Sequence, residues 1–152
     1  MPIGDLGFIG AVPVSKGALR NFVEKQYYVP PNGSAGSTVE TVLDKMLKGT
    51  GAGYDPVQII QIEVIPAAAI TVNSGNYVTL NILDRGPAGA GDTVIASLAL
   101  NTGEYPAFVP FELTLNGAAA GPNLNDVLTF QVVPTGSGQD LPQLAIRMRI
   151  SA

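Results

Sequence analysis

Apolar and polar residues alternate along six separate stretches of the second two-thirds of the chain. In one of them, Ile60, Ile62 and Val64 alternate with Gln61 and Glu63. A period of two is typical of a β-strand that buries one face and exposes the other. The sequence therefore predicts six strands, at about residues 57–64, 78–82, 93–100, 109–115, 128–132 and 144–150.

Short segments rich in Gly, Asn, Asp and Pro separate the predicted strands, and such residues favour turns. Because no helical pattern lies between the strands, we expect an antiparallel sandwich or barrel rather than an α/β sheet. One or two further strands, from near residues 70–71 or from residues 26–29, would complete a jelly-roll-like pair of sheets. The predicted fold class is all-β, an antiparallel, jelly-roll-like β-sandwich at residues 54–152.

The first 53 residues show no sustained period of 2 or 3.6, and a Pro-Pro-Asn-Gly turn follows at residues 30–33. This segment is predicted to be an extended N-terminal arm. Its one regular piece begins at Ser37, where Ser-Thr-Val-Glu fits a helix capping box with Glu40 at the third helical position. Apolar residues then recur at helical spacing up to a capping Gly49. A short amphipathic helix is therefore predicted at about residues 38–48.

The composition narrows the classes of function. The chain contains no Cys and no His, so it lacks thiolate nucleophiles, disulfides, the usual zinc and copper ligands and the side chain best suited to proton transfer near neutral pH. Hydrophobic residues make up 46% of the chain, without the run of about 20 that a membrane-spanning helix needs. We expect a soluble protein that is not an enzyme, carries no cofactor and does not contact a membrane.

Charge is unevenly distributed along the chain. Residues 1–50 hold five Lys or Arg and four Asp or Glu, whereas residues 51–152 hold three and eight, which together give the net charge of −4. An acidic body repels phosphate backbones, and the first fifty residues contain no basic run. Nucleic acid is therefore not an expected partner.

Glycine clusters and strand-end carboxylates are two further candidate sites. The glycines at residues 49–53, 86–91 and 136–138 fit neither the dinucleotide-binding nor the phosphate-loop spacing, which indicates ordinary loops. Carboxylates at strand ends could converge on a hard cation such as calcium. However, Asp is a common turn residue, and no single loop supplies several of them, so no metal site is predicted. These carboxylates are Asp84, Asp92, Asp126 and Asp140.

Large apolar side chains in the N-terminal segment are the main candidates for partner binding. An extended segment cannot bury such side chains locally, so they tend to dock onto a partner. An arm that folds back onto its own sandwich is the alternative. The predicted partner-binding residues are Phe8, Ile9, Arg20, Phe22, Tyr27 and Tyr28.

Two arginines share the exposed face of the last predicted strand. Arg147 and Arg149 could pair across the sheet with Glu112 or Glu63, which at a wet surface is worth only about 0.2–1 kcal/mol. They could equally form ion pairs across a subunit interface, where Arg is favoured. The sequence leaves both alternatives open.

Several strand-and-turn phrases of the body resemble small structural proteins of tailed bacteriophages, of the head decoration or cement type. The resemblance covers residues 57–151 and includes no catalytic signature. The phrases that carry it are SGNYVTL at residues 74–80, FVPFELTL at residues 108–115, NDVLTF at residues 125–130 and GSGQDLP at residues 136–142.

The resemblance implies a β-sandwich that sits as a homotrimer on the outer surface of the capsid. Its partner would be the major capsid protein, whose neighbouring subunits it would clamp with its terminal arms after assembly in the host cytoplasm. A tail-associated module that binds a host receptor or glycan is the first alternative. A hydrolase that depends on two carboxylates is the second.

Overall fold

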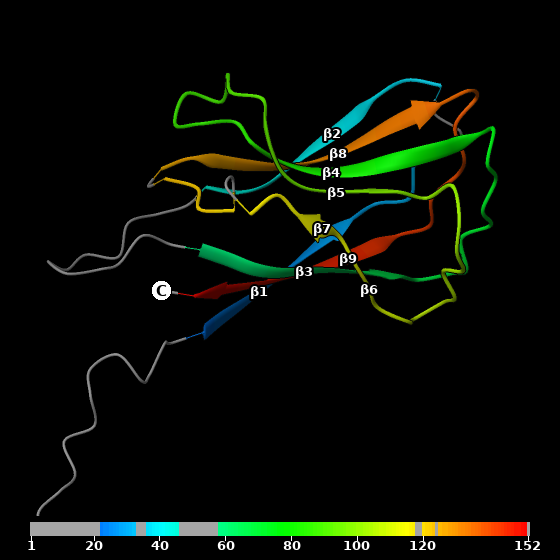
Figure 1. Ribbon diagram of the computed structural model, residues 1–152, viewed down its shortest axis with the longest axis horizontal. Coiled ribbons are helices and arrows are strands. Elements are labelled where there is room, and N and C mark those ends of the chain that lie inside the picture. Colours follow the sequence, from blue (N-terminus) through cyan, green and yellow to red (C-terminus); the bar gives the residue numbers. More distant parts are fainter. Residues whose placement is uncertain (1–21, 33–35, 46–57, 118–119, 124, 152) are drawn as a thin grey trace, which may run out of the picture.

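The computed structural model describes residues 22–32, 36–45, 58–117, 120–123 and 125–151. These residues form nine β-strands in two antiparallel sheets and contain no helix. Figure 1 shows the two sheets stacked as layers, with β2, β8, β4 and β5 in one layer and β1, β9 and β3 in the other. The predicted all-β sandwich is confirmed.

The strands are β1 (Phe22–Val29), β2 (Val39–Lys45), β3 (Gln58–Pro66), β4 (Tyr77–Asp84), β5 (Thr93–Ala99), β6 (Phe111–Glu112), β7 (Thr114–Leu115), β8 (Val127–Thr135) and β9 (Leu144–Ser151).

The strands pair like one long hairpin that has been folded over itself. Outward from the middle of the chain, β4 pairs with β5, β3 with β6, β2 with β8 and β1 with β9. Successive pairs alternate between the sheets, whose strand orders are β1-β9-β3-β6 and β2-β8-β4-β5-β7. Nested pairs that alternate between two sheets give the connectivity of a jelly roll.

The core lies between the two layers and is filled by the alternate residues of each long strand. Leu128, Phe130 and Val132 of β8 are buried, as the alternation predicts, and Phe130 is only 1% exposed. Ile62 of β3 and Met148 of β9, which lie in the opposite sheet, are buried in the same core. Burying one such side chain stabilises the fold by about 1.5–3 kcal/mol. The core between the sheets therefore supplies most of the driving force for folding.

The predicted helix at residues 38–48 is wrong over the residues that the structure describes. Residues 39–45 form β2, and its register against β8 shifts by one residue between Val42 and Asp44. A bulge inserts one extra residue into a strand. Val39, Val42 and Leu43 have the i, i+3, i+4 spacing of a helix, but they do not share one buried face, since Val42 is 69% exposed whereas Leu43 packs against the core. Residues 46–48 lie outside the described residues.

The segment predicted to be an arm supplies two strands of the sandwich. β1 includes residues 26–29, which the sequence offered as an additional strand, and β2 follows it. Each is the edge strand of its sheet. Residues 22–45 therefore belong structurally with the sandwich that was predicted to begin at residue 54, whereas residues 1–21 lie outside the described part.

The predicted strand at residues 109–115 is divided in the structure. Phe111 and Glu112 pair with β3 in one sheet, while Thr114 and Leu115 pair with β5 in the other. The chain crosses between the sheets at Leu113, which is buried. The other five predicted strands are confirmed as β3, β4, β5, β8 and β9.

Candidate partner-binding surfaces on the two sides of the sandwich

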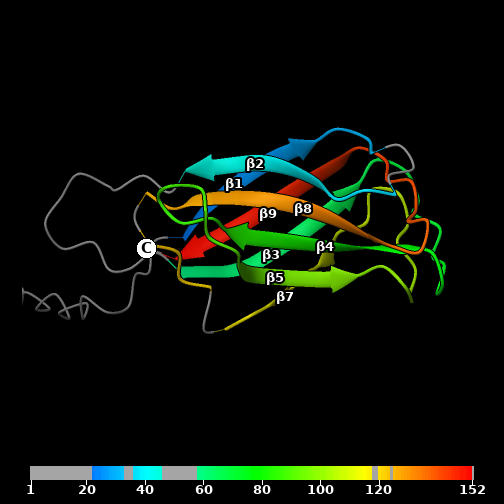
Figure 2. The same cartoon turned by 90° about the horizontal axis from the view of Figure 1, so that it is seen from above.

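A sandwich of two sheets has two open sides, where the edge strands lie. One side is formed by β1 and β2 and is called here the β1–β2 side. The opposite one, formed by β6, β7 and the loop before β6, is called the β6–β7 side. Figure 2 shows β1 and β2 along one side of the molecule and β5 and β7 along the other.

The predicted partner-binding residues fall into two groups. Phe22 is the first residue of β1, and Tyr27 and Tyr28 lie near its end. Because successive side chains of a strand point to opposite faces, Tyr27 and Tyr28 have different surroundings. The remaining predicted residues, Phe8, Ile9 and Arg20, lie outside the described residues.

Tyr27 joins the two sheets on the β1–β2 side. Its hydroxyl donates a hydrogen bond of 2.9 Å to Asp44 Oδ2, and the Lys25 ammonium pairs with the same carboxylate. Burial, and then the bond to Asp44, raise the pKa of Tyr27 above its usual range. Burial alone would raise the pKa of Asp44, but the bonds from Lys25 and Tyr27 lower it. Tyr27 therefore has an internal role that the sequence did not predict.

Tyr28 points outward, with 66% of its surface exposed. Its hydroxyl accepts a hydrogen bond of 3.0 Å from Gln26 Nε2. Val23, Val39 and Val42, also on β1 and β2, are exposed as well. Four of the six large apolar side chains exposed among the described residues therefore lie on the β1–β2 side.

Glu40, predicted as part of a helix cap, instead ties β2 to the loop between β4 and β5. Its Oε1 accepts hydrogen bonds from Arg85 Nε at 2.6 Å and from Thr129 Oγ1 at 2.5 Å. Arg85 also binds the Gly91 carbonyl at 2.9 Å and pairs with Asp92. The hydrogen bond from Arg85 is the main cause that lowers the pKa of Glu40. These contacts cover the outer face of β8 near Thr129, which is buried.

The arginines of β9 have partners within the chain. Arg147 Nε donates to Glu63 Oε2 at 2.6 Å, across the β3–β9 pair, and this bond raises the pKa of Arg147. Arg149 Nη2 lies 3.8 Å from Glu24 Oε2, across the β1–β9 pair. The partner of Arg147 is thus Glu63 rather than Glu112. An intersubunit ion pair stays a prediction, and Arg149 is the freer of the two arginines.

The loop before β6 presents a large apolar side chain that the sequence did not single out. Phe108 is 73% exposed and has a backbone φ of 61°. A bulky residue in this left-handed region costs on the order of 1–2 kcal/mol, so the surrounding structure must impose the conformation. The Phe108 N–H donates to the Pro66 carbonyl at 2.8 Å, which ties the loop to β3.

The base of the same loop is also fixed. The rings of Tyr105 and Phe111 pack edge to face with centroids 4.6 Å apart. Pro106 and Pro110, whose φ angles are restricted, flank the loop tip. Val109 beside Phe108 is exposed, although the alternation placed it in a strand with a buried face. The loop thus holds two apolar side chains outward in a defined position, and the bracketing prolines were its only sequence signal.

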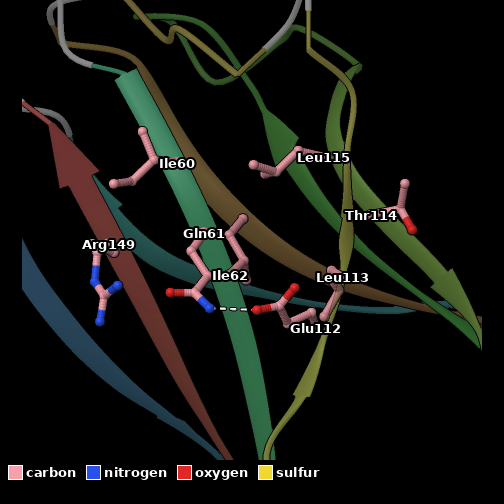
Figure 3. A pocket seen from close by; sticks show the side chains of 8 residues that line it. All are labelled: Ile60, Gln61, Ile62, Glu112, Leu113, Thr114, Leu115 and Arg149. Carbon is pink, nitrogen blue, oxygen red and sulfur yellow. Dashed lines mark hydrogen bonds between the residues drawn. The ribbon is translucent and has the colours of Figure 1, made fainter.

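A groove of about 460 Å³ opens where the chain crosses from β6 to β7, beside the first half of β3. β6 pairs only with Glu63 and Val64, so the first half of β3 has no strand beside it there. Figure 3 shows the gap between β3 and the β6–β7 crossing, with Gln61 bonded to Glu112 at its rim. Its apolar lining consists of Ile60, Ile62, Leu113 and Leu115.

The strand-end carboxylates do not come together as one group. Asp126 is buried and accepts the Asn123 N–H at 2.7 Å, and Asp84 accepts the Gly86 N–H at 2.7 Å. Burial and the neighbouring Asp126 raise the pKa of Asp84. Asp140 is exposed between β8 and β9. Within the described ranges, no three acidic side chains are placed to hold a metal ion.

No family model and no curated protein sequence matches the chain. Within the part of the chain that the structure describes, no helix is long and apolar enough to cross a membrane.

Proposed function

We propose that this chain is a structural virion protein that binds the outside of a tailed-bacteriophage capsid. It stabilises the shell by clamping neighbouring major capsid subunits, acts as a homotrimer assembled in the host cytoplasm, and catalyses no reaction. The strand-and-turn resemblance supports this function, and so does the jelly-roll connectivity, which recurs among viral capsid proteins and also among lectins.

The observation that carries the proposal is the position of the exposed apolar side chains. All six large ones among the described residues lie on the two open sides of the sandwich, on β1, on β2 and in the Phe108 loop. Apolar side chains exposed at the edges of a sandwich are suited to contact with other proteins, and this supports the proposal. By contrast, the described carboxylates of β2 and the β4–β5 loop are used in internal bonds, as Glu40 and Asp92 show.

The N-terminal segment extends the reach of such a subunit. β1 begins at an edge of its sheet, so the 21 residues that precede Phe22 start from the side of the molecule. Fully extended, a segment of that length spans about 70 Å. Phe8 and Ile9 would supply its apolar anchors. Several weak anchors on one oligomer bind together far more tightly than one alone, which makes a clamp feasible for so small a protein.

The exposed Phe108 loop favours the alternative function, a tail-associated module that binds a receptor. Apart from Phe108, the tip from Pro106 to Pro110 contains only Pro, Ala and Val. It therefore offers no side chain that could hydrogen-bond to sugar hydroxyls. A protein surface suits this loop better than a glycan does.

Electron microscopy of purified virions tests the proposed function. An antibody against the exposed β4–β5 loop at residues 86–91 labels the chain in virions of a phage that encodes it. We expect label over the head, at positions that repeat with the symmetry of the shell. Label confined to the tail would establish the alternative, and virions that lack the chain would refute both.

A further inference from the structure

The groove beside β3 is closed at both ends by backbone hydrogen bonds. The Leu113 N–H donates to the Ile62 carbonyl at 3.0 Å, and the Ile59 N–H donates to the Ala120 carbonyl at 2.8 Å. Only two residues of β3 separate Ile59 from Ile62. The opening, which Figure 3 shows between β3 and the crossing of β6 and β7, is therefore too short to admit another strand and takes individual side chains.

The N-terminal segment starts from the same end of this sheet. Phe22 pairs with Ser151, and Ser151 pairs with Gln58, the first residue of β3. The groove is level with Arg149, two residues further along, and lies one strand position beyond β3. With strands about 4.8 Å apart and a rise of about 3.4 Å per residue, the groove is about 16 Å from Phe22.

The length of chain before Phe22 selects the residues that can reach the groove. An extended residue spans about 3.3 Å, so Leu19, three residues before Phe22, reaches only about 10 Å. Val14, the next large apolar residue, reaches about 26 Å. Val12 and Val14 flank Pro13, and a residue before proline adopts an extended backbone, in which residues i and i+2 share one face. This segment can thus present two apolar side chains together.

We propose that Val12 and Val14 of the N-terminal segment dock into the groove of their own chain. The segment then crosses the outer face of β9 and is fastened at the β6–β7 side. A tether of eight residues holds Val14 at a high effective concentration near its own groove, which favours the same chain over a second copy. Only residues 12–14 need to be ordered, and Pro13 already has a restricted φ, so the entropy cost is small.

Charge complementarity supports this occupant. Lys16 and Arg20 lie between Val14 and β1, whereas the rim of the groove carries Glu112. Glu112 is exposed, and its bond within the described residues is to the neutral Gln61 amide. Lys16 is two residues, or about 7 Å, from Val14, which is near enough to pair with this carboxylate. Such a pair at a wet surface contributes more to orientation than to affinity.

Fastening the segment at residues 12–14 gives its free end a direction. Phe8 and Ile9 would project from the β6–β7 side, where Phe108 and Val109 are exposed, so both sets of apolar side chains would face one partner. This consequence rests on the proposed function, whereas the docking is tested without shells. Docking in a protein that does not bind shells would refute the capsid function alone. Shell binding without docking would refute the docking alone.

A pair of engineered cysteines tests the docking, because the chain contains none of its own. Val14→Cys is combined with Ile60→Cys in the groove. In the control it is combined with Val42→Cys, at a position that is 69% exposed on the β1–β2 side. Glutathione redox buffers measure the effective concentration of each pair in the full-length protein, both folded and in urea. The groove pair should exceed the control pair at least tenfold in the folded protein, and this preference should vanish in urea.

Methyl NMR gives a second measurement that leaves the groove residues unchanged. Val14→Asp should shift the methyl resonances of Ile60 and Leu115, because a charged side chain does not stay in an apolar groove. Leu19→Asp is the matched control, since it lies in the same segment but too near Phe22 to reach the groove, and it should leave these resonances in place. In a mixture of isotope-labelled and unlabelled cysteine variants, the disulfides should form within single chains.

Four results would overturn the proposal: equal effective concentrations of the two cysteine pairs in the folded protein, disulfides that join different chains, methyl resonances that Val14→Asp leaves unchanged, or an equal shift caused by Leu19→Asp.

Discussion

The two sheets are joined in different ways at the two open sides of the sandwich. On the β1–β2 side, two long edge strands are joined across the sheets by polar side chains, with Lys25 and Tyr27 both bound to Asp44. On the β6–β7 side, the chain itself crosses from one sheet to the other at the buried Leu113, between strands of two residues each. The sheets are therefore joined by charged and polar side chains on the β1–β2 side, and by apolar packing on the β6–β7 side.

The difference shows how a small jelly roll can avoid unwanted strand pairing. Long exposed edges invite pairing with other chains, and charged residues or bulges prevent it. The β1–β2 side carries charges in both edge strands and a bulge in β2. The β6–β7 side needs neither, because its edge strands are too short to template another strand. It can therefore present apolar side chains, as the Phe108 loop does.

The largest expected effect comes from the core beneath both sides. Phe130→Ala removes a fully buried ring and should lower the free energy of unfolding by about 3–5 kcal/mol. Urea unfolding measures this loss. Ala88→Ser in the exposed β4–β5 loop is the control and should change stability by no more than about 0.5 kcal/mol. Equal losses from the two substitutions would show that the assignment of the buried face is incorrect.

The β6–β7 side should respond to loss of volume and not to pH. Leu113→Ala leaves a cavity where the chain crosses between the sheets and should cost about 2–5 kcal/mol at both pH 7 and pH 3. Urea unfolding of this variant and the wild type at both values is the measurement. Val42→Ala, at an exposed position of β2, is the matched control and should have little effect. A cost that depended strongly on pH would remove the distinction between the two sides.

The β1–β2 side should respond to pH. Asp44→Asn leaves the Lys25 ammonium without its charged acceptor and should cost about 1–3 kcal/mol at pH 7. The pKa of Asp44 is lowered in the folded protein, so its contribution is complete above the unfolded pKa and is lost as pH falls through the folded pKa. The difference between variant and wild type should therefore shrink in acid. A constant difference from pH 7 to pH 2 would contradict this role.

The smallest expected effect is a gain in stability, whereas the three substitutions above lower it. Burial, and then the neighbouring Asp126, raise the pKa of Asp84, so its charge is disfavoured in the folded state. The penalty is present above the folded pKa and disappears as pH falls below the unfolded pKa. Asp84→Asn keeps an acceptor for the Gly86 N–H and should raise stability at pH 7 by up to about 1 kcal/mol, with no gain in acid. Thermal melting of the variant and the wild type, from pH 7 into acid, is the measurement. A loss of stability at pH 7 would contradict the prediction.

The sequence predicts the interior strands because local alternation reflects their burial. In β8, Leu128, Phe130 and Val132 alternate with polar neighbours, and the structure buries all three. β1 and β2 are different, since Lys25 and Tyr27 occupy inward positions only because Asp44, in the other sheet, receives their hydrogen bonds. A pairing of residues 19 positions apart leaves no local pattern. The apolar residues of β2 also have helical spacing, which misleads because Val42 is exposed and not part of one buried stripe.

The candidate surfaces show the same limit. Tyr28 was predicted as a partner-binding residue, and it is exposed. The Phe108 loop was missed, because the alternation at residues 109–115 continues through the point where the chain changes sheets. Nothing local marks that crossing. The exposure of Phe108 follows from its bond to Pro66 and its positive φ, both of which depend on the tertiary structure.

The structure also changes how the N-terminal anchor must be tested. A deletion of residues 1–28 would remove most of β1 and damage the sheet. A deletion of residues 1–21 leaves every described strand intact, and we expect it to separate folding from attachment. The measurement compares the truncated and complete proteins in thermal melting and in occupancy on shells stripped of the chain.

An unchanged melting temperature together with loss of shell binding is the predicted result. Unchanged occupancy would contradict the clamp, because the anchor would then lie elsewhere on the molecule.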